Sequence, residues 1–313
     1  MYEPQHLKTN GIHDRCRFYL GWLLGLAVIV TANAVSADNF LDLGAGIASN
    51  SNVTRAFLDS DQYRDVSATL DLTAGRFVEL RPGRSVTTFA TLSASRFNEL
   101  IGLNSESIGV GSVYQHKFGL GAYAPTVGAA LNWSQHNSRG KTRDRHIAEF
   151  ELSYSKRLSP AWNTRIGAAH EVSEGTHDGR RYASQYSTRN DIFDFDQTTL
   201  FATMDYVFAN DTMLALTYTW IDGNTVSSAL APNPRLLGIA KALTLDPAVK
   251  APPGRNQVAY SLASRAHLVA LDWSIPLGRD TSLNLGYVRQ EIRADSSVDY
   301  GNDQFSVTFM LVL

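Results

Sequence analysis

The chain has 313 residues, with 28 basic and 30 acidic side chains and a single cysteine, Cys16. The formal net charge of −2 leaves no excess of positive charge for a nucleic-acid backbone, so a nucleic-acid partner is not expected. One cysteine also excludes an internal disulfide, and the fold must be stable without one.

Residues 1–37 have the three parts of a secretory signal peptide. Lys8, Arg15 and Arg17 precede an apolar run at 18–30, and the small residues at 32–37 suit cleavage near Ala37. The apolar run is too short to cross a hydrocarbon layer, which takes about twenty helical residues. We therefore expect residues 1–37 to be cleaved on export, leaving a mature chain, 38–313, without a thiol.

From residue 38 onward, segments of about ten residues alternate apolar and polar side chains, the period of a β-strand with one apolar face. The apolar members are Leu41, Leu43, Ala45 and Ile47; Val66, Ala68, Leu70 and Leu72; Ile108 and Val110; Val127, Ala129, Leu131 and Trp133; Phe150, Leu152 and Tyr154; Ile166 and Ala168; Leu200, Ala202 and Met204; Leu214, Leu216 and Tyr218; Val269, Leu271 and Trp273; Leu283, Leu285 and Tyr287; and Phe305, Val307, Phe309, Leu311 and Leu313. Segment 86–97 alternates too irregularly to assign its faces. The pattern predicts about twelve strands.

The connections between these segments alternate in length. Short ones rich in Gly, Pro, Asn and Asp are typical of hairpin turns, and the long ones are 48–63, 98–106, 134–146, 173–195, 222–263 and 292–303. With an even strand number, all short turns fall on one rim and all long loops on the other. This indicates an all-β fold, a transmembrane antiparallel up-and-down β-barrel with short periplasmic turns and long extracellular loops. Aromatic residues near predicted strand ends, such as Trp162, Tyr206 and Trp273, suit girdles at the two membrane interfaces.

The chain resembles Gram-negative outer-membrane β-barrel proteins, porin-like members of an uncharacterised proteobacterial family. The resemblance lies in the signal peptide, the turn "RLSPAW", the stretch "NSNVTRA" (50–56) and the terminal strand "QFSVTFMLVL". It implies location in the cell outer membrane, contact with its lipids and lipopolysaccharide, and recognition of the C-terminal strand by the barrel-assembly machinery. In such proteins this strand usually ends on Phe or Trp, whereas this chain ends on Leu313. The resemblance implies no cofactor and leaves the oligomeric state open.

The polar positions of the strands should face the lumen of such a barrel. The charged residues predicted there, seven acidic and three basic, are Asp65, Asp71, Lys117, Glu149, Glu151, Arg157, Arg165, Glu171, Asp205 and Asp272. Charges in an interior must be hydrated or paired. They therefore either line a water-filled path with a mild preference for cations or pair into a polar plug. A twelve-stranded barrel is wider than side-chain-filled eight-stranded ones, which favours a narrow pore.

Loop 222–263 is long enough to have a function of its own. It is rich in proline, and "PRLLGIAKAL" could form a short amphipathic helix. The loop could constrict the lumen, form a lid or extend outside, and we expect it to fold inward.

Two other loops carry clusters of basic residues: Arg139, Lys141, Arg143 and Arg145 in one, and Arg180 and Arg181 in the next. We expect these side chains to contact lipopolysaccharide phosphates. The alternative is a surface that collects an anionic solute.

An enzymatic alternative rests on His136 and Ser138, because outer-membrane phospholipases and lipid A deacylases use a similar His-x-Ser pair. In those families Asn-Gly or Asn-Ala follows the serine, whereas Arg139 and Gly140 follow it here. His136 also shares the inward face with Asn132 and Ser134, away from acyl chains. Glu149, Glu151 and Glu171 could gather around a divalent cation, although the spacing shows no metal-ligand pattern.

The sequence therefore favours a non-enzymatic outer-membrane barrel, either a passive narrow channel for small polar solutes or an envelope component. The alternatives are a lipid hydrolase using His136 and Ser138, and a structural or assembly partner in an export system.

Overall fold

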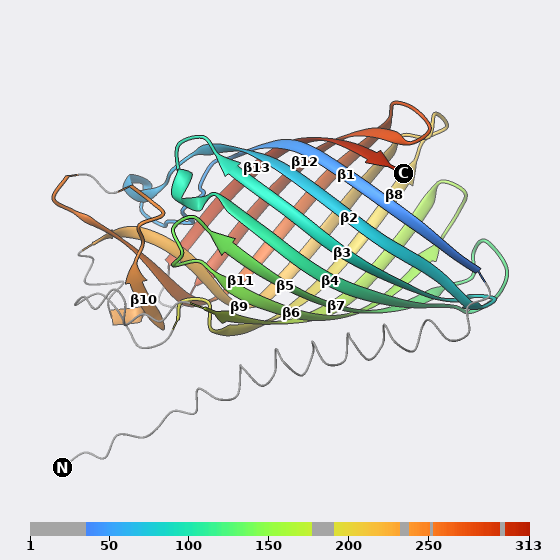
Figure 1. Cartoon of the computed structure of the whole chain (residues 1–313), viewed down its shortest axis with the longest axis horizontal. Coiled ribbons are helices and arrows are strands. Elements are labelled where there is room, and N and C mark those ends of the chain that lie inside the picture. Colours follow the sequence, from blue (N-terminus) through green and yellow to red (C-terminus); the bar gives the residue numbers. More distant parts are fainter. Residues whose placement is uncertain (1–35, 177–190, 232–237, 251–252, 295–297) are drawn as a thin grey trace, which may run out of the picture.

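A computed structural model describes residues 36–176, 191–231, 238–250, 253–294 and 298–313. Twelve long antiparallel strands close into one barrel, and the short β10 lies outside the ring (Figure 1). The ring consists of β1 (Ser36–Asn50), β2 (Asp65–Arg81), β3 (Arg84–Phe97), β4 (Ser105–Lys117), β5 (Thr126–Ser138), β6 (Arg145–Arg157), β7 (Trp162–Gly175), β8 (Phe195–Val207), β9 (Met213–Ala231), β11 (Asn256–Pro276), β12 (Thr281–Ala294) and β13 (Val298–Val312). Strand β10 is Ala242–Leu245, and the 3-10 turns η1 and η2 are Asp59–Asp61 and Ile101–Leu103.

The ring closes between its first and last strands. β1 pairs with β13 from Asp42 opposite Val312 to Asn50 opposite Gln304. Leu41 and Leu313 add two backbone hydrogen bonds of 3.0 and 2.8 Å. Closure satisfies the edge groups of both strands, as a hydrocarbon environment requires.

The outer wall is apolar along most of its height. Leu70, Leu216 and Leu271 are 52%, 51% and 42% exposed on the outside of the cylinder. In a water-soluble sandwich they would be buried in a dry core, so their exposure on a closed barrel identifies lipid as their neighbour. In segment 86–97 the register now assigns the faces, with Leu92 exposed outside and Ser93 bonding to Ser107 inside (2.6 Å between hydroxyl oxygens).

Aromatic and charged side chains border this apolar wall. At the short-turn rim, the ring of Tyr206 packs on Trp162 and Phe208 with centroid distances of 4.8 and 4.7 Å. Toward the long-loop rim, Arg96 pairs with Glu106 (2.5 Å) and Arg289 with Asp303 (2.7 Å). Charged pairs of this kind mark where the wall leaves the hydrocarbon, because an ion there would be costly to desolvate.

Two of the predicted long loops are shorter than expected. β12 and β13 pair up to Ala294 opposite Val298, so the predicted loop 292–303 is wrong. β9 continues to Ala231 and β11 begins at Asn256. Both ends of the predicted loop 222–263 are therefore strand, and the connection between the two strands is shorter than predicted. The alternation disappears there because residues 225–231 and 257–262 are buried on both faces.

No helix in the described ranges is long and apolar enough to span a bilayer. The predicted helix "PRLLGIAKAL" falls partly outside these ranges. Of its described residues, Gly238 and Ile239 are helical, and its end, from Ala242, begins β10. The signal-peptide prediction also falls largely outside them, since the description begins at Ser36.

Candidate functional site

The strand register places every predicted lumen charge on the inner face. Residues directly opposite each other in an antiparallel pair share a face. Starting from the outward Leu70, this rule assigns to the inside Asp65, Asp71, Lys117, Glu149, Glu151, Arg157, Arg165, Glu171, Asp205 and Asp272.

Several of these charges are engaged in holding the barrel together. Asp65 accepts hydrogen bonds from the backbone N–H groups of Glu99 and Leu100, the latter at 2.8 Å, and so anchors the β3–β4 loop. Glu151 forms an ion pair with Arg165. By contrast, Asp71 and Asp272 have no hydrogen bond or ion pair within the described residues. Both side chains are exposed on the inner face, which is compatible with a water-filled lumen.

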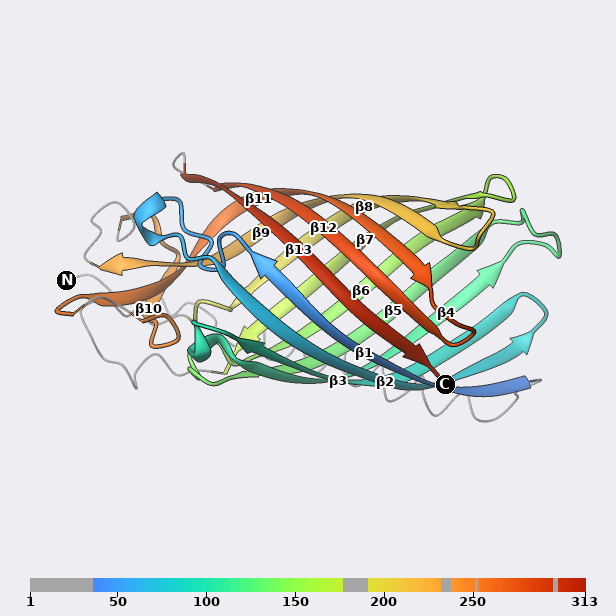
Figure 2. The ribbon, with the colours of Figure 1, turned by 90° about the horizontal axis from the view of Figure 1, so that it is seen from above.

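On the external side, β9 and β11 extend beyond the strands that neighbour them in the ring, β8 and β12. β8 pairs only as far as Asp222 of β9, and β12 only from Ser264 of β11. β10 takes the place beside β11 that β12 leaves, from Ala242 opposite Ser261 onward. We call residues 223–231, 242–249 and 256–264 the outer cap, which lies at the long-loop end in both views (Figures 1 and 2).

The outer cap reaches loops from several parts of the rim. Ser228 N donates to the carbonyl of Thr54 (2.9 Å) in the β1–β2 loop, and the Ser227 hydroxyl bonds to Tyr300 of β13 (3.1 Å). Gly102 of η2 lies so close that a Cβ there would be 2.4 Å from the Cα of Ala248. Contacts this far apart around the ring place the cap across the external mouth.

A buried ion pair fastens the cap to the β5–β6 loop. Arg143 bonds through one terminal nitrogen to Asp246 and to the hydroxyl of Ser228, both at 2.7 Å. The Asp246 side chain is fully buried and also accepts from Ser228 (2.6 Å). The expectation that Arg143 contacts lipopolysaccharide is therefore wrong, because its guanidinium group is paired with Asp246 inside the outer cap.

Arg145 likewise points inward. It begins β6 on the same face as Glu149, and its guanidinium carbon lies 4.4 Å from the ring centre of Phe193. It therefore cannot be a lipopolysaccharide ligand either. Arg139 and Lys141 are exposed in the β5–β6 loop, and Arg180 and Arg181 lie outside the described residues.

The stretch "NSNVTRA" forms a tight, buried turn after β1. Asn52 is 1% exposed, and its amide donates to the carbonyls of Ala56 (2.9 Å) and Gly301 (3.3 Å). Its side-chain oxygen accepts from Ala56 N (3.1 Å). Arg55, with a φ of 51°, takes the left-handed conformation that few side chains adopt. The turn thus holds Arg55 out from the loop into the lumen.

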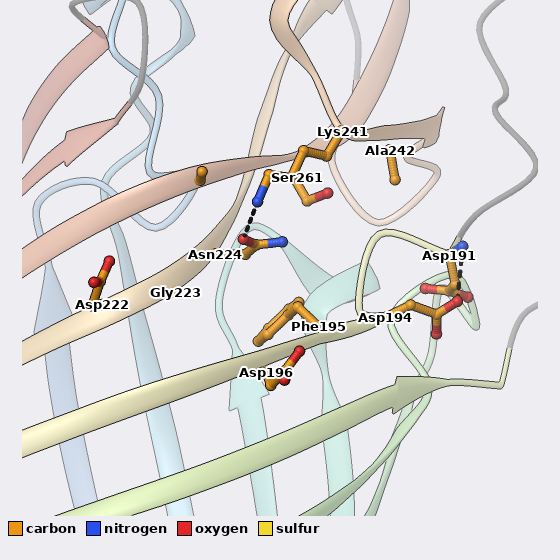
Figure 3. Close-up of a pocket in the computed structure, with 11 residues that line it drawn as sticks. Asp191, Asp194, Phe195, Asp196, Asp222, Gly223, Asn224, Lys241, Ala242 and Ser261 are labelled. Atoms are coloured by element: carbon orange, nitrogen blue, oxygen red, sulfur yellow. Dashed lines mark hydrogen bonds between the residues drawn. The ribbon is translucent and has the colours of Figure 1, made fainter. Parts of the chain in front are cut away.

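A cavity of about 500 Å³ opens beside the cap, between β8, β9 and β11 (Figure 3). Its aspartates serve the fold of the β7–β8 connection, since Asp191 accepts from Phe193 N (2.9 Å) and Asp194 from Gly175 N (3.0 Å). Lys241 donates to Asn224 across it (3.0 Å). Among the described residues, this cavity therefore has no free set of ligands.

The proposed catalytic pair does not form. His136 bonds to Ser134 (3.2 Å), whereas the Ser138 hydroxyl donates to Asp144 (3.1 Å), and both residues face the lumen. The hydrolase alternative has no support in this arrangement, because a lipid-acting nucleophile must reach acyl chains. Within the described ranges, no three His, Cys, Asp or Glu side chains cluster closely enough to hold a metal ion, so Glu149, Glu151 and Glu171 form no such group.

A closed twelve-stranded cylinder with an apolar outer wall, a polar lumen, short turns on one rim and long loops on the other is an outer-membrane β-barrel of the Gram-negative type. The protein therefore lies in the cell outer membrane, surrounded by its lipids.

Comparison with solved structures shows the same fold. The chain superposes on the crystal structure of the COG4313 outer membrane channel from Pseudomonas putida F1 with a TM-score of 0.58, at 11% identity over 90% of this chain and 97% of that one. The outer membrane channel DcaP of Acinetobacter baumannii gives a TM-score of 0.41 at 8% identity, covering 90% and 98%. The KdgM porin in complex with disordered oligogalacturonate gives 0.41 at 7% identity, covering 86% and 98%. No family model and no curated protein matches the sequence.

Proposed function

We propose that the protein is a passive channel that admits small polar solutes through a narrow lumen. The observation that carries this proposal is an inner face with exposed carboxylates, Asp71 and Asp272, that have no hydrogen bond or ion pair within the described residues of a closed barrel. A barrel that served only as a scaffold would be expected to pair or remove such charges. The likeness in fold to an outer membrane channel from Pseudomonas putida F1 supports it.

In this proposal the ten inner charges line the path, and the outer cap sets its width. Arg139 and Lys141, with Arg180 and Arg181 of the next loop, contact lipopolysaccharide phosphates around the rim. The C-terminal strand, which ends at the β1–β13 seam, is the part recognised by the barrel-assembly machinery. The protein has no catalytic role, which agrees with the separate partners of His136 and Ser138.

Conductance in planar bilayers tests the channel. One variant replaces residues 232–255 by Asn-Gly, a sequence suited to joining Ala231 to Asn256, which face each other in the register. We expect small discrete currents from the wild type and larger ones from this variant, because it lacks Asp246, the partner of Arg143, and much of the outer cap over the mouth.

A matched control replaces residues 119–124 of a short turn by Asn-Gly. Phe118 N bonds to Pro125 O (2.9 Å) there, so the hairpin can close without the deleted residues. This control should conduct like the wild type. If folded barrels of both the wild type and the cap-deleted variant conduct no current, the protein is not a pore, and the remaining interpretation is an envelope component.

A further inference from the structure

Arg55 projects into the lumen with its charge uncompensated. Its neighbours Thr54 and Ala56 are buried, whereas Arg55 itself is exposed. Its side chain has no hydrogen bond or ion pair within the described residues. A strained backbone conformation that holds a free charge at one place points to a function for that charge.

Arg145 brings a second positive charge to the same place. Arg55 lies close enough to repel it, while Glu171 attracts it. The Nε of Arg145 is buried without a hydrogen-bond partner in the described part of the chain. A buried donor without a partner is unfavourable, so the site is incomplete as it stands. An anion placed between the two guanidinium groups would supply the missing acceptor.

The two arginines line one cavity of about 340 Å³ beneath the outer cap. Glu171 is the third charged group in this lining, so arginine charge exceeds carboxylate charge two to one. The remaining walls differ in character. The apolar part includes Phe193, Phe195, Ile221 and Leu268, and the amide part includes Gln197, Gln290, Asn302 and Gln304.

We propose that Arg55 and Arg145 form a binding site for small organic anions that join a carboxylate to an apolar or aromatic body. The carboxylate lies between the guanidinium groups, and the body packs on Phe193 and Phe195. This inference rests on the proposed channel function and narrows its solutes. It also reverses, for the external end, the cation preference expected from the predominantly acidic lumen.

Benzoate is a suitable probe, with benzylammonium and benzyl alcohol as cationic and neutral compounds of similar size. Each compound is added to the external side while potassium chloride current is recorded. Benzoate should reduce the wild-type current at concentrations where the other two have no effect. Arg55→Gln should raise the half-blocking benzoate concentration about tenfold or more, the loss expected for one charge-assisted hydrogen bond. Arg55→Lys should retain part of the block.

The matched control is Arg279→Gln, in the exposed turn between β11 and β12. Benzoate should block the current through this variant at the same concentration as in the wild type. Equal block by benzoate and benzylammonium, or an unchanged half-blocking concentration in Arg55→Gln, would overturn the site while leaving the channel intact. Equilibrium dialysis of radiolabelled benzoate against the purified barrel gives a readout that needs no conduction. Binding that Arg55→Gln weakens would support the site even if bilayers stay silent, and absence of binding to the wild type would refute it.

Discussion

Asn52 and Arg55 are three residues apart in the β1–β2 loop and have different roles. Asn52 is buried and joins its own loop to β13, through Gly301 and Asn302. Arg55 is exposed, its side chain has no hydrogen bond or ion pair within the described residues, and its backbone is in a left-handed conformation. The sequence singled out "NSNVTRA" only as a resemblance. Its structural role depends on contacts about 250 positions along the chain, which no local pattern encodes.

Substituting these two residues should separate structure from function. Asn52→Ala removes the side-chain acceptor of the Ala56 N–H and the side-chain donor to two carbonyls, and we expect it to lower the free energy of unfolding by about 1–3 kcal/mol. Arg55→Gly relieves an unfavourable backbone conformation and should leave that free energy unchanged or raise it by up to about 1 kcal/mol. Urea titration of barrels in lipid vesicles, followed by tryptophan fluorescence, measures both. Equal destabilisation by the two changes would contradict this division.

At the scale of the strands, the sequence predicts the outer wall better than the lumen. Alternation identified Leu70, Leu216 and Leu271 as lipid-facing because lipid imposes one requirement, an apolar surface, on every second residue. The inner face has no such uniform requirement. Phenylalanines also lie inside, each across from a glycine on the next strand, as in Phe40 opposite Gly75 and Phe89 opposite Gly111. An aromatic ring that covers a facing glycine stabilises the pair, but alternation alone cannot reveal it.

Gly75 lies between two such rings, so its substitution tests this packing. A Cβ there would be 2.3 Å from Phe40 and 2.8 Å from the backbone oxygen of Thr88. Because backbone cannot yield as a side chain tip can, we expect Gly75→Ala to lower the free energy of unfolding by about 1–3 kcal/mol. Gly121→Ala is the matched control, since no atom lies within 4 Å of its added Cβ. If the same titration shows no difference between the two variants, the Phe–Gly row does not stabilise the wall.

For the whole molecule, the sequence patterns that predict a closed barrel recur along the chain, whereas no recurring pattern predicts the outer cap. Twelve alternating segments and the order of short and long connections define the barrel, because each strand meets the same lipid and the same neighbours. The outer cap is a single feature, buried on both faces, and its contacts join β9 and β11 to distant loops. The interior destination of Arg143 and Arg145 follows from that cap. The sequence cluster of basic residues therefore suggested an exposed basic surface, but in the folded protein two of its four residues, Arg143 and Arg145, lie inside.

Closure also bears on the processing of the N-terminus. Removal of residues 1–37 would delete only Ser36 and Ala37 from β1, the partners of Glu79 and Val78 in β2. The β1–β13 seam, which runs from Leu41 to Asn50, would keep all its pairs. We therefore expect intact mass and N-terminal sequencing of barrels purified from outer membranes to give a chain beginning at Asp38, without Cys16. Such a chain should run on gels as a compact, heat-modifiable species. A mature protein that retains residues 1–35, or one cut beyond Leu41, would contradict the predicted cleavage near Ala37, and in the second case β13 would lose bonds that close the ring.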